Sequence, residues 1–80
     1  MLDELRGAKK VVGIKQLRRA LSAGSVAKAF LASDADPRLT DPLAEQCAQT
    51  GVALERVPSM KELGKAAGID IGAAAAGILR

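Results

Sequence analysis

The hydrophobic and polar positions of the chain follow a helical period most clearly between Gly13 and Gly24. Apolar residues recur there at the spacing that gives a helix one apolar side. A glycine bounds each end of the segment, which permits a tight entry and a C-terminal stop. The apolar side of this expected helix holds Ile14, Leu17, Ala20 and Leu21, the opposite side holds Lys15, Gln16, Arg19 and Ser22, and Arg18 lies near the border.

Other stretches carry the signals of short strands and of two further helices. Apolar runs at 8–12, 26–32 and 52–57 predict strands. A second helix is expected to begin near Arg38 or at Asp41–Pro42, where Asp41 would be the N-cap, and to end at Gly51. One face of it would include Leu39, Leu43, Cys47 and either Ala48 or Thr50. A short helix over 2–6 and a polar turn at 33–37 complete this part of the chain.

A capping box marks the start of the third helix, because Ser59 precedes Glu62 by three residues. This helix should end at Gly68 and be followed by a loop at 69–72. The alanine-rich run 73–79 fits a helix or a strand by composition, and the preceding alternation of strands and helices favours a strand. We therefore expect an α/β fold in one domain spanning 1–80, a three-layer α-β-α sandwich with a small four-stranded mixed sheet.

Composition excludes most catalytic chemistry. The chain has no His, which is the commonest general base and metal ligand, and its single Cys cannot form an internal disulfide or a cysteine-rich zinc site. Cys47 is most simply a small buried side chain. For Asp34, Asp36 and Asp41, turn and cap roles are favoured over a carboxylate metal or acid-base site. We expect no enzyme, with no catalytic residue, metal site or cofactor.

Positive charge is concentrated at the start of the chain. The net charge is +3, but residues 1–25 carry six basic and two acidic side chains, a net of +4. The first turn of the helix after Gly13 would add unpaired N–H donors and the positive end of the helix dipole, a combination suited to a polyanion. The alternative interpretation is an ordinary solvated helix face. No signal peptide is visible, and the longest apolar run, 71–79, is too short to span a bilayer, so a cytoplasmic protein that does not bind membranes is expected.

Three segments together resemble one known family. They are 13–24 (GIKQLRRALSAG), 32–37 (ASDADP) and 57–69 (VPSMKELGKAAGI). Their order and sequence resemble the kink-turn RNA-binding ribosomal protein family, which includes the archaeal large-subunit protein that is also the box C/D core protein, and above all its small bacterial members. The resemblance implies an α-β-α sandwich that binds kink-turns, which are sharply bent RNA internal loops with a three-nucleotide bulge and tandem sheared G·A pairs.

The resemblance also implies a set of RNA-binding residues. The family signature is Gly-x-Asn-Glu with a Lys three residues after the Glu. Lys15 and Gln16 stand in place of the Asn and Glu, as is usual in the bacterial branch, and Arg19 stands in place of the Lys. An apolar loop forms the family's second contact. The implied RNA-binding residues are Gly13, Ile14, Lys15, Gln16, Arg18, Arg19, Ile69, Asp70 and Ile71.

The chemistry of these side chains fits that role, and alternatives stay open. Gln16 can donate to and accept from the edges of a sheared pair, and a cationic side chain can reach guanine or phosphate. Ile69 and Ile71 could instead pack under the last strand. Lys9 and Lys10 suit solvated strand-edge charges or phosphate contacts.

The expected partner is structured RNA containing a kink-turn, ribosomal or other, bound by a monomer, and not DNA. Gln16 in place of Glu removes a carboxylate acceptor, which could alter affinity or the preferred base pair. This substitution favours the second hypothesis, a protein-interaction or assembly module that kept the fold but lost specific RNA recognition.

Overall fold

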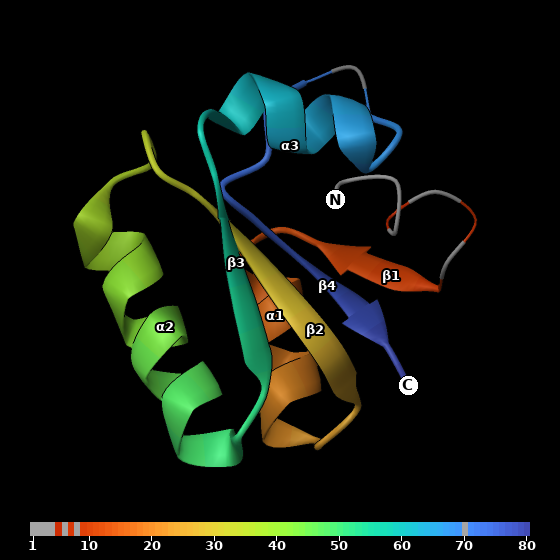
Figure 1. Cartoon of the computed structure of the whole chain (residues 1–80), viewed down its shortest axis with the longest axis vertical. Coiled ribbons are helices and arrows are strands. Elements are labelled where there is room, and N and C mark those ends of the chain that lie inside the picture. Colours follow the sequence, from red (N-terminus) through yellow and green to blue (C-terminus); the bar gives the residue numbers. More distant parts are fainter. Residues whose placement is uncertain (1–4, 6, 8, 70) are drawn as a thin grey trace.

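Strands and helices alternate along the described part of the chain, as the hydrophobic pattern predicts. The computed structural model describes residues 5, 7, 9–69 and 71–80. The helix expected over 2–6 therefore lies outside the described residues, apart from Leu5. The elements are β1 (Lys10–Val12), α1 (Ile14–Ser22), β2 (Val26–Ala32), α2 (Pro37–Thr50), β3 (Ala53–Val57), α3 (Met60–Ala66) and β4 (Ala75–Leu79) (Figure 1).

The four strands form one mixed sheet in the order β1-β4-β2-β3. β4 lies between β1 and β2 and is antiparallel to both, whereas β2 and β3 are parallel and are connected through α2. The alanine-rich run at the end of the chain is therefore a central strand, and the expectation of a four-stranded mixed sheet is confirmed. In the β1–β4 pair, Val12 lies opposite Ala76, so the end of β1 meets the start of β4.

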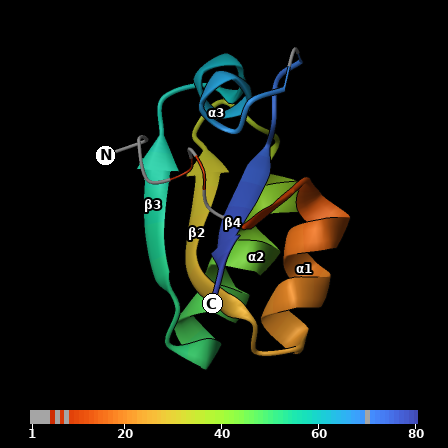
Figure 2. The same cartoon turned by 90° about the vertical axis from the view of Figure 1, so that its right-hand side faces the viewer.

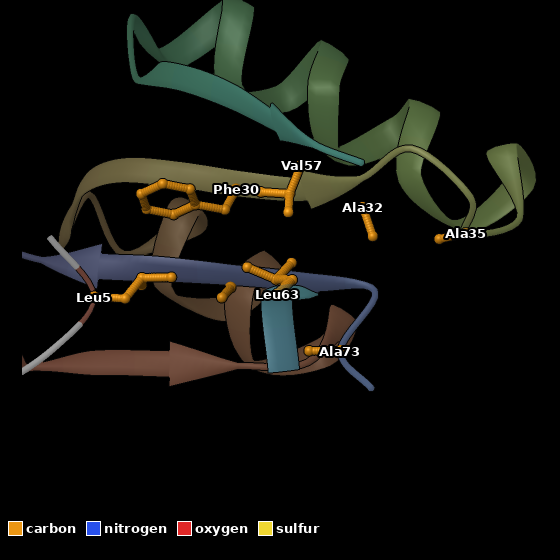
Figure 3. Close-up of a cluster of buried hydrophobic side chains, with 8 residues drawn as sticks. Leu5, Phe30, Ala32, Ala35, Val57, Leu63 and Ala73 are labelled. Atoms are coloured by element: carbon orange, nitrogen blue, oxygen red, sulfur yellow. The ribbon is translucent and has the colours of Figure 1, made fainter. Parts of the chain in front are cut away.

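Helices cover both faces of the sheet, which confirms the α-β-α sandwich. α1 and α2 lie together on one face (Figure 2). The core beneath them is formed by Leu17, Leu21, Val26, Ala29, Leu31, Leu43, Cys47 and Ala75. α3 packs on the other face with Leu5, and the core there is formed by Leu5, Phe30, Ala32, Ala35, Val57, Leu63, Ala73 and Ala76 (Figure 3).

Small residues in β4 bring α1 close to the sheet. A Cβ atom added at Gly77 would lie 2.6 Å from Leu17 Cδ1, so the helix packs where a side chain would otherwise stand. Because protein interiors are close-packed, Leu17 can occupy this position only while residue 77 has no side chain. The interpretation of Cys47 as a buried residue is confirmed, and burial raises the pKa of its thiol.

The start of α2 agrees with the first of the two expected positions, near Arg38, and not with the second. The helix begins at Pro37, and the Asp36 side chain accepts a hydrogen bond from the Arg38 N–H at 2.9 Å, so the assignment of Asp41 as N-cap is wrong. Pro42 lies inside the helix and cannot donate to the Arg38 carbonyl four residues earlier. That carbonyl belongs to an exposed residue, so water can replace the missing donor.

The residues of α2 that face the core differ in part from the expectation. Leu39, expected on the buried face, is 50% exposed, and Thr40 is buried in its place with Leu43 and Cys47. These three positions share the i, i+3, i+7 spacing of one helix face, and Leu39 lies at the edge of that face. The prediction for Leu39 is therefore wrong, as is that for Ala48 or Thr50, which are both exposed.

α3 begins and ends as the sequence predicts. Ser59 Oγ accepts a hydrogen bond from the Glu62 N–H at 3.1 Å, and Gly68 follows the helix with φ +81°. Asp34, in the turn after β2, accepts a hydrogen bond from the Met60 N–H at 2.8 Å, which fits the turn role expected for it. Within the described residues, no helix is both long and apolar enough to cross a membrane.

Replacing Asp36 should destabilise the protein more than replacing Asp41. Asp36→Ala removes the cap of α2 and the ion pair with Arg38 at 2.8 Å, whereas Asp41→Ala removes an exposed side chain inside the helix. Thermal unfolding at pH 7 should show a lower midpoint for Asp36→Ala than for Asp41→Ala. A larger loss in Asp41→Ala would restore Asp41 as the cap.

The effect of Asp36 should also depend on pH with a definite sign. The Arg38 guanidinium, and then its backbone N–H, lower the pKa of Asp36 below the ordinary value. A lowered folded-state pKa contributes stability above the unfolded value of about 3.9, and this contribution disappears as the pH falls through the folded-state pKa. The difference in midpoint between wild type and Asp36→Ala should therefore shrink in acid.

Candidate nucleic-acid interface

Gly13 connects β1 to α1 in a conformation that suits only glycine. Its φ of +112° and ψ of 158° lie in a region that L-residues with a side chain rarely adopt. The Gly13 N–H donates to the Ala75 carbonyl at 2.8 Å, which extends the β1–β4 pairing by one residue. Its own carbonyl accepts from the Leu17 N–H at 3.0 Å. Gly13 therefore connects β1 to α1, and its hydrogen bond to Ala75 fixes this connection beside the first residue of β4.

The exposed side of α1 is cationic and open to a ligand. Lys15, Arg18 and Arg19 are exposed, and the first turn contains no acidic residue. In the described part of the chain these three cations form no ion pair, unlike Lys28, which lies 3.0 Å from Glu55. No side chain caps the helix, so its first amides add to the positive potential.

Gln16 folds back over the start of α1. A Cβ atom added at Gly13 would lie 2.6 Å from Gln16 Oε1, which places the amide group of this exposed residue beside the glycine. The glycine thus leaves room for the side chain that the sequence assigns to base recognition. An amide at this position presents both a donor and an acceptor at the helix tip.

The loop between α3 and β4 divides the two isoleucines between packing and exposure. Ile69 is partly buried and packs against the core under α3, as the packing alternative expected. Ile71 is 75% exposed, so it is available for an external contact. Asp70, between them, lies outside the described residues.

The start of α1 lies at the same end of the sheet as the loop that contains Ile69 and Ile71, which we call the isoleucine loop. Gly13 is hydrogen-bonded to Ala75, the first residue of β4, and the loop residues 71–74 lead directly into Ala75. Both views place the first turn of α1 beside the point where the loop enters β4 (Figures 1 and 2). The structure therefore places the two predicted parts of the site at the same end of the sheet.

Two hollows beside α1 were not predicted from the sequence. One, of about 370 Å³, is lined by Gln16 and Arg19 and by apolar residues that include Val11 and Leu79. A smaller one, of about 110 Å³, lies between α1 and α2 and is lined by Ile14, Arg18, Arg38, Leu39, Pro42, Leu43 and Gln46. Both hollows depend on how segments that are distant in the sequence pack together, which a local sequence pattern does not predict.

The remaining lysines of the N-terminal half lie on the edge strand. Lys9 is exposed and Lys10 is half-buried. The Lys9 carbonyl accepts a hydrogen bond from the Leu79 N–H at 2.8 Å, which fixes the backbone of this edge beside β4. A phosphate contact by either side chain stays a prediction.

Comparison with known proteins gives the family. Residues 2–80 match the family described as the ribosomal protein L7Ae/L30e/S12e/Gadd45 family. This match covers nearly the whole chain, and the chain belongs to this family. The family resemblance of the three sequence segments is thereby confirmed.

One relative agrees with this chain in length, and a solved structure agrees with it in fold. An RNA-binding protein of Geobacillus sp. (strain WCH70) is 45% identical over 76 residues, which span 95% of this chain and 93% of the relative. The large ribosomal subunit protein eL8 of Nitrosopumilus maritimus (strain SCM1) is 38% identical over 68 residues, 84% of this chain and 53% of that protein. The solved structure of the Giardia lamblia 15.5kD RNA binding protein superposes with a TM-score of 0.84 at 24% identity, covering 99% of this chain and 65% of that one, and supports the fold.

Gly13→Ala should destabilise the protein by about 1–3 kcal/mol, because alanine would be held in a glycine-only conformation. Gly24→Ala is the matched control, since Gly24 follows the other end of α1 with φ +70° and an added Cβ would meet nothing within 4 Å. Urea unfolding should show the larger loss for Gly13→Ala. A loss equal to or smaller than that of the control would show that the strained entry is unimportant.

Proposed function

We propose that this protein binds structured RNA and recognises kink-turns. Membership of the family and the relatives named RNA-binding proteins support an RNA partner. The observation that carries the proposal is that the exposed cationic tip of α1 lies at the same end of the sheet as the loop that exposes Ile71. A single bent RNA could contact both, with the helix against one stem and the loop against the bulge.

The dimensions of α1 suit an opened groove. Nine helical residues are about 13 Å long, and only the first two turns carry the proposed contacts. The major groove of regular A-form RNA is too deep and narrow for side chains, so a straight duplex would be recognised through its backbone alone. A kink opens the groove and exposes purine edges, where the amide of Gln16 can both donate and accept.

The cations and the isoleucine have different roles in this proposal. Lys15 and Arg19 reach guanine edges or phosphates, and Arg18, further from the helix tip, contacts the backbone. Their contribution falls with added salt because binding releases counterions. Ile71 covers an unstacked bulge nucleotide by apolar contact, which salt does not weaken.

Recognition of this kind also stabilises the bend. A protein that binds the kinked form better than the extended form shifts the population toward the kinked form by its differential affinity. No bond is made or broken, so the proposed function needs neither a catalytic group nor a cofactor.

Protein interaction is the second candidate function. The hollow between α1 and α2, with half-exposed Leu39 beside Arg18, is the observation that favours it. The first two turns of α1 favour RNA, because Lys15, Arg18 and Arg19 form no ion pairs in the described part of the chain and are exposed. A protein that docked in this hollow would still bind after Gln16→Ala, whereas binding to a kink-turn RNA should be weakened by the same change.

Gln16→Ala should weaken binding to a kink-turn RNA by about 10- to 100-fold, the range expected when a bidentate base contact is lost. Its affinity for a straight duplex should hardly change. Arg18→Ala should weaken both RNAs by similar factors and reduce the salt slope by about one. Fluorescence anisotropy with labelled RNAs over a salt series measures both effects.

The matched RNA control replaces the sheared G·A pairs with Watson–Crick pairs. Wild-type protein should bend the kink-turn in low-magnesium buffer, as measured by fluorescence transfer between the stem ends, and leave the control RNA straight. Equal losses on kink-turn and duplex in Gln16→Ala would contradict base recognition by Gln16. Absence of bending would contradict the proposed function itself.

A further inference from the structure

The backbone of the isoleucine loop lies directly against α3 at Gly64. This glycine is buried in the middle of the helix. A Cβ atom added there would overlap the Ile71 carbonyl oxygen and would lie 3.0 Å from the Cα of Gly72. The overlap involves backbone atoms, which cannot rotate away as a flexible side chain can. The loop can therefore occupy its present place only because residue 64 has no side chain.

Two backbone hydrogen bonds bracket the same stretch of loop. The Ile69 N–H donates to the Gly64 carbonyl at 3.0 Å, and the Ala73 N–H donates to the Met60 carbonyl at 2.9 Å. Ile71 lies between these two points. Gly72 adds a second close approach, because a Cβ atom there would lie 3.2 Å from the Met60 Cβ and 3.3 Å from the Met60 carbonyl carbon.

α3 is itself fixed to the rest of the molecule. Leu63 is completely buried in the core on this face of the sheet, and the Met60 N–H donates to the Asp34 side chain in the turn after β2. The helix therefore gives the loop a rigid support. Local preference does not explain the glycine, since glycine inside a helix costs roughly 0.5–1 kcal/mol relative to alanine.

We propose that Gly64 and Gly72 are positioning residues for RNA recognition, which hold the Ile71 backbone so that its exposed side chain meets the bulge. This inference rests on the proposed function. A side chain that is exposed but already fixed at its backbone contacts a ligand without the entropy cost of ordering a loop. Alanine at residue 64 would move the Ile71 carbonyl by on the order of 1 Å to reach van der Waals distance.

A double-mutant cycle separates positioning from general structural damage. Binding to a kink-turn RNA is measured for wild type, Gly64→Ala, Ile71→Ala and the double variant. Ile71→Ala should lose about tenfold in affinity, the size expected for one apolar contact, and Gly64→Ala a similar factor. The double variant should lose no more than the larger single loss, because both changes remove the same contact.

Two further variants serve as comparisons. Arg18→Ala combined with Gly64→Ala should give the product of the two separate losses, since Arg18 contacts RNA from a different element. Gly72→Ala has a milder steric conflict and should lose less affinity than Gly64→Ala. If Gly64→Ala fails to fold by circular dichroism, the cycle is made with Gly72→Ala, which needs no positive φ.

The outcomes distinguish this inference from the proposed function. Multiplied losses for the glycine and Ile71 variants, or unchanged RNA affinity in a folded Gly64→Ala, would overturn the positioning role while wild-type binding stands. If wild-type protein had no preference for a kink-turn over a straight duplex, the proposed function would fail, and the positioning role with it.

Discussion

The pairing of β1 with β4 determines where both parts of the proposed RNA surface stand. Its last hydrogen bond joins the Gly13 amide to the Ala75 carbonyl. One residue later the chain enters α1, and immediately before Ala75 it leaves the isoleucine loop. Two segments far apart in the sequence thus adjoin the same hydrogen-bonded residue pair of the sheet. No direct contact between the two segments is needed to place them at the same end. The glycine-only backbone at Gly13 allows the helix to start there, close enough for Gln16 to fold over the strand end.

Glycines, which have no side chain, determine much of the remaining geometry. Gly77 lets Leu17 and hence α1 approach β4, Gly13 accommodates the side chain of Gln16, and Gly64 accommodates the loop backbone. Each glycine removes bulk from a rigid part so that a recognition element can lie close to it. The buried positions on both faces of the sheet hold the layers in place. The result combines a supported backbone with exposed functional side chains, which is the arrangement that lowers the entropy cost of binding.

Local patterns predicted most elements, and long-range contacts account for what they missed. Gly51 and Gly68 end their helices with positive φ, as helix-stop signals suggest, and the period of α1 separates its buried leucines from its exposed cations. The pattern placed the cap of α2 at Asp41, whereas the structure places it at Asp36, in the stretch that the pattern assigned to a turn. The strand order could not be predicted, because pairing between distant strands has no local signature. The same holds for Gly64, whose neighbour is set by the path of a loop rather than by helical spacing.

Nuclear magnetic resonance titration with a kink-turn RNA tests most directly whether the helix tip and the loop form one surface. The measured quantities are the backbone amide chemical shifts of residues 13–19 and of the loop residues around Ile71. They are followed as RNA is added to the isotope-labelled protein. A single surface predicts that both groups change together and reach their end points at one RNA per protein. If only one group changed, or if the two groups saturated at different RNA concentrations, the helix and the loop would not share a ligand.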